Sequence, residues 1–144
     1  MRRLSFAAAL VALVAGCQST TEPAPPEVFM LMTIDGRALP TMRSSDSAIV
    51  LSESLVLNGQ GLAIRATAVQ GENAPRNTSV AYAYTRQGDV LTIGERVCSG
   101  GGSCALHAAE QGVINGGTLY LSAVPSKSSV SAPVLVYQRG ANIY

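Results

Sequence analysis

The side chains with the most scope for chemistry in this 144-residue chain are three cysteines and one histidine. Cys98 and Cys104 are separated by a glycine-rich run of five residues, and His107 follows three residues later. Thioredoxin-like redox pairs have two intervening residues, and no second pair of metal ligands accompanies these cysteines. If the chain is exported to an oxidising compartment, we expect a structural disulfide between Cys98 and Cys104. A redox or metal site is the alternative.

The third cysteine, Cys17, lies at the end of a different kind of segment. Arg2 and Arg3 are followed by an apolar run over residues 4–14 that only Ser5 interrupts. That run is shorter than the roughly 20 residues that cross a bilayer as a helix. A short cationic start before an apolar run of this length is typical of a signal peptide, here expected as a helix.

Residues 13–17, Leu-Val-Ala-Gly-Cys, resemble the lipobox of bacterial lipoproteins. The resemblance implies that the thiol of Cys17 accepts a diacylglyceryl group and that residues 1–16 are removed as the signal peptide. Acylation of the new amino group, for example by palmitate, would give the stable anchoring that a single chain does not. An ordinary secretory peptide with an incidental Cys17 is the alternative.

Gln18 follows the cysteine, and resemblance to enterobacterial sorting rules then favours the outer membrane over the inner membrane. The predicted location is therefore the cell envelope, with a lipid bilayer as partner and the body of the protein in the periplasm. Residues 18–27, which include three prolines, cannot bury apolar area and favour an extended tether. The expected parts are thus a signal peptide over 1–16, a lipidated and flexible segment over 17–27, and one domain over 28–144.

The composition excludes one class of partner. Charged residues make up 13% of the chain, against roughly 25% in average globular proteins, and the net charge is +1. A nucleic-acid-binding protein needs a basic face toward phosphates, so we expect no nucleic acid as partner. The hydrophobic fraction of 47% is sufficient for a packed core.

The pattern of the body predicts strands almost throughout. Turn residues between them, Asn58-Gly59, Gly88-Asp89 and Asn115-Gly116, are typical of hairpins because asparagine, aspartate and glycine tolerate positive φ. The expected strands cover residues 28–35, 48–57, 62–69, 78–86, 90–97, 104–113, 118–124 and 132–139. About eight antiparallel strands favour an all-β, closed up-and-down barrel, which leaves no exposed sheet edge. A two-sheet β-sandwich is the alternative.

Several strand-turn segments of the body carry a second resemblance. GRALP, LNGQG, YTRQGDVLTI, GVINGGTLYLS and VLVYQRG, in this order, resemble the lipocalin-like small β-barrels of uncharacterised bacterial envelope lipoproteins. The chain contains no tryptophan and so lacks the Gly-x-Trp signature of lipocalins proper. The resemblance implies a small barrel but does not imply the ligand pocket of lipocalins proper.

Some residues are candidates for lining a ligand cavity. Glu53 falls on the apolar face of strand 48–57, where an unpaired buried carboxylate would be costly. We favour a bulge at residues 52–54 that turns Glu53 to water; the alternative is a cavity in which Glu53 pairs with Arg65. Tyr82 and Tyr84, on the large side-chain face of strand 78–86, are candidates for the same cavity. Met30 and Met32 are expected to fill the core.

Catalytic patterns are weak. A nucleophile-histidine site would have to use His107, which we expect at the surface or near a loop. The acids Asp35, Asp46, Glu72, Asp89 and Glu110 are mostly expected at turns. We therefore expect no enzyme, cofactor or metal site.

The predicted function is a membrane-anchored, non-catalytic binding module for a small apolar ligand or an envelope partner. The alternative is a structural or assembly accessory whose barrel is filled by its own side chains. Strand number alone does not separate a hollow barrel from a filled one.

Overall fold

The structure is a computed structural model that describes residues 24–44, 46–98, 109–124 and 132–140. These residues form strands, turns and connections, with ten strands in one antiparallel sheet. The strands are β1 (Glu27–Ile34), β2 (Arg37–Ala38), β3 (Thr41–Arg43), β4 (Ala48–Leu57), β5 (Leu62–Val69), β6 (Arg76–Gln87), β7 (Val90–Arg96), β8 (Glu110–Asn115), β9 (Thr118–Ala123) and β10 (Val134–Arg139). Among the described residues, no helix has the length and apolar character needed to cross a membrane.

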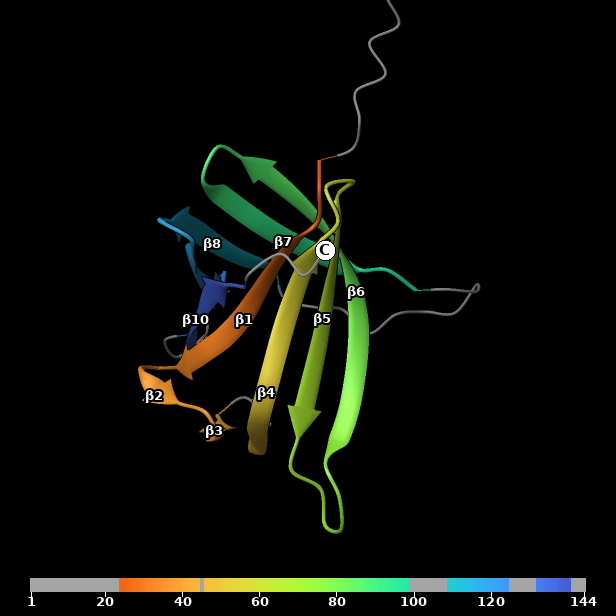
Figure 1. Ribbon diagram of the computed structural model, residues 1–144, viewed down its shortest axis with the longest axis vertical. Helices are drawn as coiled ribbons and strands as arrows, with labels where there is room; N and C mark the ends of the chain where they lie inside the picture. The colour runs from red at the N-terminus through yellow and green to blue at the C-terminus, as the bar shows by residue number, and fades with distance from the viewer. Residues whose placement is uncertain (1–23, 45, 99–108, 125–131, 141–144) are drawn as a thin grey trace, which may run out of the picture.

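The sheet closes on itself into a barrel. β4 to β10 follow one another as neighbours, and β1 pairs with β10 on one side and with β4 on the other. The two short strands pair where β1 and β4 no longer pair with each other: β2 lies along the end of β1, and β3 lies along the start of β4 (Figure 1). The all-β, antiparallel barrel of eight strands is therefore confirmed, and the sandwich alternative is wrong.

The predicted strand bounds agree closely with the observed ones. β4 and β5 match residues 48–57 and 62–69, and the other strands differ by a few residues at their ends. The predicted strand over 104–113 is observed as β8, shifted toward the C-terminus, while residues 104–108 lie outside the described part. The two-residue β2 and three-residue β3 were not predicted. The signal peptide and most of the tether also lie outside the described residues.

The barrel has two different ends. At one, which we call the short-turn end, tight turns join β4 to β5, β6 to β7 and β8 to β9. Gly88 and Gly116 have φ of 60° and 56° there, as the hairpin prediction requires. β1 also starts at this end, because Glu27 pairs with Leu57 at the close of β4 (Figure 1). The longer connections lie at the opposite end, which we call the long-connection end.

Apolar side chains pack inside the barrel, most densely toward the short-turn end. Fully buried members of this core include Phe29, Leu55, Leu91, Leu119 and Tyr137. The expectation that the methionines of β1 fill the core is wrong: Met30 is 42% exposed and Met32 52% exposed. β1 is apolar on both faces, so its sequence does not reveal which face turns inward, and Phe29 and Leu31 occupy the inner one.

Candidate functional site: a buried charged cluster

Three charged side chains lie inside the barrel. They are Glu53 on β4, Arg65 on β5 and Glu110 on β8, which are 3%, 8% and 8% exposed. Successive side chains of a strand point to opposite faces, so Ala63, Arg65 and Thr67 point inward together. β5 therefore turns the more polar of its two faces to the interior.

A bulge in β4 decides where Glu53 points. The pairing of β4 with β5 shifts register between Val50 and Ser52. Val50 points inward before the shift, and Glu53, Leu55 and Leu57 point inward after it. A bulge is therefore present near the predicted place. It changes the alternation of the side chains that precede Ser52 and leaves Glu53 pointing into the barrel. The favoured prediction that Glu53 faces water is wrong. Glu53 points inward and lies beside Arg65, as the alternative expected, but it is not among the side chains that line the interior cavity.

Arg65 and Glu110 form the centre of the cluster. The guanidinium donates Nη1–H to Oε1 of Glu110 at 3.1 Å and Nη2–H to Oε2, a forked pairing of two parallel hydrogen bonds. Glu110 was expected at a turn, and that expectation is wrong. It shares the inner face of β8 with Gly112 and Ile114. The alternation of Glu110, Gly112 and Ile114 was the only sequence signal of this placement.

Glu53 is held from several directions. Its carboxylate accepts hydrogen bonds from the hydroxyls of Tyr137 at 2.5 Å and Thr67 at 2.7 Å. Nε of Arg65 lies 3.5 Å from Oε1, and Nη1 of Arg43 lies 3.7 Å from Oε2. Arg43 in turn pairs with Asp46 at 2.6 Å. The interior carboxylate is thus both charge-compensated and hydrogen-bonded, as a buried charge requires.

Burial and pairing shift several ionisations. Burial alone would lower the pKa of Arg65, but Tyr137 and the carboxylates of Glu110 and Glu53 outweigh it and raise that pKa above its ordinary value. Burial, assisted by Glu53, raises the pKa of the Tyr137 hydroxyl well above its ordinary value. Burial also raises the pKa of Tyr82. The arginine is therefore charged and both tyrosines are neutral at ordinary pH.

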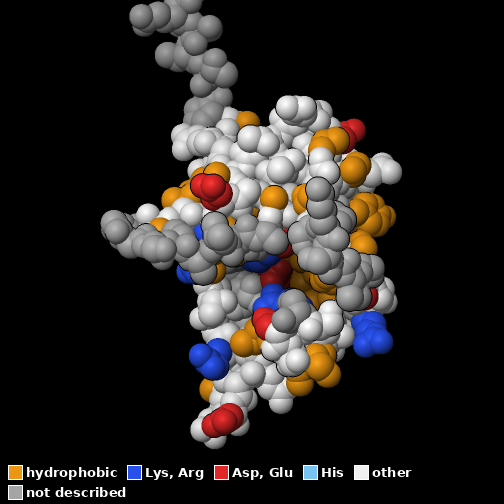
Figure 2. All heavy atoms as spheres, turned by 180° about the vertical axis from the view of Figure 1, so that it is seen from behind, with side chains coloured by type: hydrophobic (Ala, Val, Ile, Leu, Met, Phe, Trp, Pro, Cys, Tyr) orange, Lys and Arg blue, Asp and Glu red, His pale blue; other side chains and the backbone are white. Residues whose placement is uncertain are grey.

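A cavity of about 370 Å³ lies beside the cluster, toward the long-connection end. Its lining is charged or polar in one part and apolar in another: Arg43, Arg65, Thr67, Thr78, Val80, Tyr82, Glu110, Ala123, Pro133 and Leu135. The guanidinium of Arg65 lies over the ring of Tyr82 at 5.5 Å. In the view from behind, acidic, basic and apolar side chains meet in a hollow (Figure 2).

The arrangement favours binding over proton transfer. Both interior carboxylates are engaged with Arg65, so neither is an isolated acid or base. Nε of Arg65 is buried and has no hydrogen-bond partner among the described residues. A polar atom of a ligand would find donors and acceptors here, and an apolar ligand surface would find Val80, Tyr82 and Leu135.

The other predicted site residues are placed as follows. Tyr82 lines the cavity, whereas Tyr84 is partly buried and packs against the apolar core. Cys98 lies just after β7, but Cys104, His107 and Cys17 are outside the described residues, so the disulfide and the lipidation stay predictions. Asp35, Asp46, Glu72 and Asp89 lie between strands, as expected of turn acids. The described ranges contain no group of three or more metal-ligating side chains.

Comparison of the chain with protein-family models, with curated proteins and with solved structures found no match. The cluster and its cavity are therefore interpreted from their own geometry.

Replacing Arg65 should destabilise the barrel strongly. In Arg65→Met, two interior carboxylates lose their shared cation, and loss of one partner of a buried ion pair costs about 3 to 5 kcal/mol. Arg43→Met is the matched control, because the side chain of Arg43 is more exposed than that of Arg65 and its main partner, Asp46, is exposed; we expect about 1 kcal/mol or less. Urea unfolding measures both free energies. Equal losses in the two variants would contradict a central role for Arg65.

The raised pKa of Tyr137 predicts alkaline sensitivity. A hydroxyl that ionises less readily when folded stabilises the fold fully below its unfolded pKa of about 10, and this contribution is lost as pH rises through the folded pKa. Urea unfolding between pH 8 and 11 should therefore show a steeper loss of stability in the natural protein than in Tyr137→Phe. The difference should be about 1.4 kcal/mol per pH unit above pH 10. Tyr120→Phe, at an exposed position, should keep the natural slope; a similar change in both variants would refute the assignment.

Proposed function

We propose that the protein is a lipid-anchored envelope lipoprotein whose barrel is a non-catalytic binding module. The ligand occupies the cavity at the long-connection end. The observation that carries this proposal is the buried Arg65–Glu110 pair in the wall of a cavity that is otherwise partly apolar.

Charges inside the barrel are better explained by binding than by stability. Taking two ions out of water is costly, and well-packed apolar residues of similar volume often give equal or greater stability. The short-turn half shows that this chain can fill a barrel interior with leucine, isoleucine and aromatic side chains. A barrel that serves only as a scaffold would gain nothing from Glu53, Arg65 and Glu110 in its other half.

The lining indicates the chemistry of the ligand. The volume of about 370 Å³ is in the lower part of the range of small-molecule sites. Val80, Tyr82 and Leu135 offer apolar contacts, while Arg65 and Glu110 offer a donor and acceptors. Arg65 is shared by the carboxylates of Glu110 and Glu53, and Arg43 pairs with Asp46, so neither cation is left over for an anionic ligand. We therefore propose a small, mainly apolar molecule that carries an uncharged polar group.

The anchoring proposal rests on the lipobox-like residues 13–17 and agrees with the direction of β1. β1 starts at Glu27 in the short-turn end, ten residues after Cys17. An acylated Cys17 would hold that end toward the membrane, with the outer membrane and the periplasm as the proposed location. The cavity, at the opposite end, would face away from the bilayer. A disulfide from Cys98 to Cys104 would close a loop after β7, at this same outer end.

A structural or assembly accessory is the second candidate. The densely filled apolar half of the barrel favours it, since that half leaves no described space for a ligand among Phe29, Leu55, Leu91 and Leu119. In this case an envelope protein, rather than a small molecule, would be the partner.

Native mass spectrometry of the protein extracted from its membranes tests the binding proposal. We expect the natural protein to carry a small molecule, and Val80→Trp to lose it because the larger side chain fills the cavity. Ser79→Trp is the matched control, since Ser79 is exposed and points outward on the same strand. A small molecule retained in Val80→Trp, or absent from the natural protein, would contradict binding in the cavity.

The same spectra test the anchor. We expect a polypeptide that begins at Cys17 and carries acyl chains. An unmodified polypeptide, or one that begins elsewhere, would show that the anchoring proposal is wrong while leaving the cavity result intact.

A further inference from the structure

We propose that β6 binds an extended peptide segment of another protein, which pairs with the start of β6 as an added strand. The site lies at the mouth of the interior cavity, but it requires neither the lipid anchor nor a small molecule inside that cavity. It therefore goes beyond the proposed function and adds a peptide as a second kind of ligand.

Hydrogen bonding with β5 decides which way the main chain of β6 points. Tyr84 donates its N–H to the carbonyl of Gly61, just before β5, at 2.8 Å. The register of β5 and β6 is unbroken, and hydrogen-bonded residues alternate along an antiparallel pair. Every second residue before Tyr84 therefore bonds with β5. The residues between them, Asn77, Ser79 and Ala81, direct their main-chain N–H and C=O groups to the opposite side.

Part of that opposite side is unpaired. β7 pairs with β6 as far as Tyr82, and Val97, just after β7, donates to the carbonyl of Ala81 at 2.8 Å. β6 runs on from there toward the long-connection end (Figure 1). In this stretch the outward main-chain groups of Asn77 and Ser79 have no main-chain partner among the described residues. We call them the free edge; they are the unpaired donors and acceptors with which a further strand can pair.

Hollows lie on both faces of the free edge. The lining of the interior cavity of about 370 Å³ includes Thr78 and Val80. On the outer face, a hollow of about 450 Å³ has Ser79, Ala81 and Val97 in its lining. Successive side chains of an added strand point to opposite faces, so one would enter the cavity mouth and the next the outer hollow. Main-chain pairing with pockets for alternate side chains is one way in which proteins recognise extended peptides.

The space beside the free edge suits a single strand. The cavity is bounded by β6 on one side and by Glu110, Ala123 and Leu135 on the other, and β7 contributes no described residue to its lining. β6 of a second copy carries its own β5, and so would bring two strands into this space. A helix pairs its own main-chain groups and would leave those of Asn77 and Ser79 unpaired. The occupant that fits is therefore a peptide in extended conformation.

The free edge lacks the usual protection against pairing. Natural sheet edges are kept apart by charged side chains, by proline or by a bulge. Residues 77–81, Asn-Thr-Ser-Val-Ala, contain no charged residue and no proline, and their pairing with β5 has no bulge. An unprotected edge between two hollows is what a strand-adding site requires.

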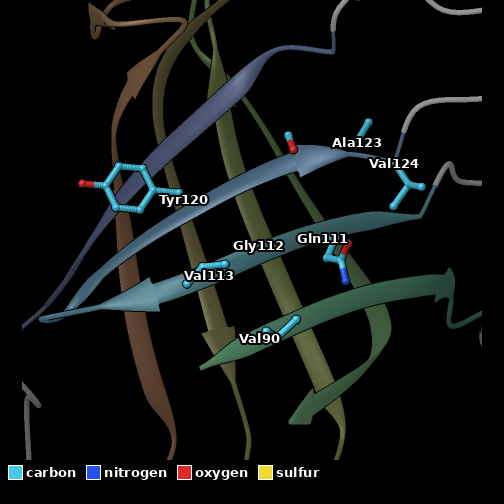
Figure 3. Close-up of a pocket in the computed structure, with 8 residues that line it drawn as sticks. Val90, Gln111, Gly112, Val113, Tyr120, Ala123 and Val124 are labelled. Atoms are coloured by element: carbon cyan, nitrogen blue, oxygen red, sulfur yellow. The ribbon is translucent and has the colours of Figure 1, made fainter. Parts of the chain in front are cut away.

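A third hollow, of about 460 Å³, provides a comparison. It lies on the outer face of β7, β8 and β9, with Val90, Val113 and Tyr120 in its lining (Figure 3). Each of these residues pairs with a neighbouring strand on both sides. This hollow offers apolar contacts but no free edge, so a substitution in it serves as a control.

Selection of peptides by the protein extracted from its membranes tests this inference. The probe is a displayed library of random decapeptides, and we expect the natural protein to enrich peptides that bind as strands. Ser79→Pro removes an N–H of the free edge and should weaken the enriched peptide at least about tenfold. Ser79→Ala keeps that N–H, and Val113→Asp lies in the third hollow, so both should bind within about twofold of the natural protein.

Proline is tolerated in an edge strand where its nitrogen faces solvent, so Ser79→Pro is expected to fold, which urea unfolding checks. If it does not fold, Asn77→Pro removes the other N–H of the free edge and replaces it in the test. Amide hydrogen exchange of the natural protein is a second readout. The peptide should slow exchange at Ser79 at least about tenfold and leave Thr78, which is bonded to β5, unchanged.

Several results would overturn the proposal. They are a selection that enriches no peptide, an enriched peptide that binds Ser79→Pro as tightly as Ser79→Ala, and unchanged exchange at Ser79 when the peptide is bound. Slow exchange at Ser79 without peptide would show that the chain itself or a second copy already covers the free edge, and would equally overturn it. None of these results bears on the small molecule in the cavity, which Val80→Trp tests separately.

Discussion

A positive charge inside a closed barrel must have its counter-charges there too. Arg65 satisfies this constraint with Glu110 and Glu53, which come from strands far apart in sequence. β8 lies three strands beyond β5 in the sheet, so the contact between Arg65 and Glu110 crosses the interior. The bulge in β4 and the inward hydroxyls of Thr67 and Tyr137 complete the arrangement around Glu53. The bulge and the contact of Thr67 with Glu53 belong to the hairpin of β4 and β5, whereas the contacts of Arg65 with Glu110 and of Tyr137 with Glu53 exist only once the barrel has closed.

The cluster divides the interior into two parts with different properties. Toward the short-turn end, buried apolar side chains pack densely and supply the hydrophobic stabilisation of the domain. Toward the long-connection end, the charged pair borders a cavity with a mixed lining. A similar contrast holds outside, where the wall over β7 to β10 is uncharged and the described charges gather at the ends. Packing and binding would thus use separate parts of one small barrel.

The sequence predicted the barrel well because turns and alternation are local. Asn58-Gly59 and Asn115-Gly116 mark hairpins, and clear strand patterns set the bounds of β4 and β5. The inward face of β1 was not predictable, since Met30 and Phe29 are both apolar and only the closed sheet selects between them. Arg65 was considered as a partner of Glu53, but Glu110 was not, because its pairing depends on two strands brought across the barrel. β2 and β3 are two and three residues long and are defined only by their pairing with β1 and β4. Strands this short show no alternation in the sequence.

We propose that the interior charges serve a ligand rather than the fold. The most direct measurement is a native mass spectrum of the Arg65→Met/Glu110→Leu double variant beside that of the natural protein. We expect the double variant to fold, because Arg65 and Glu110 are removed together and Glu53 keeps the hydrogen bonds from Thr67 and Tyr137 and the nearby charge of Arg43. We also expect it to lose the small molecule that the natural protein carries. A folded double variant that keeps the same molecule would show that the charged pair does not serve the ligand.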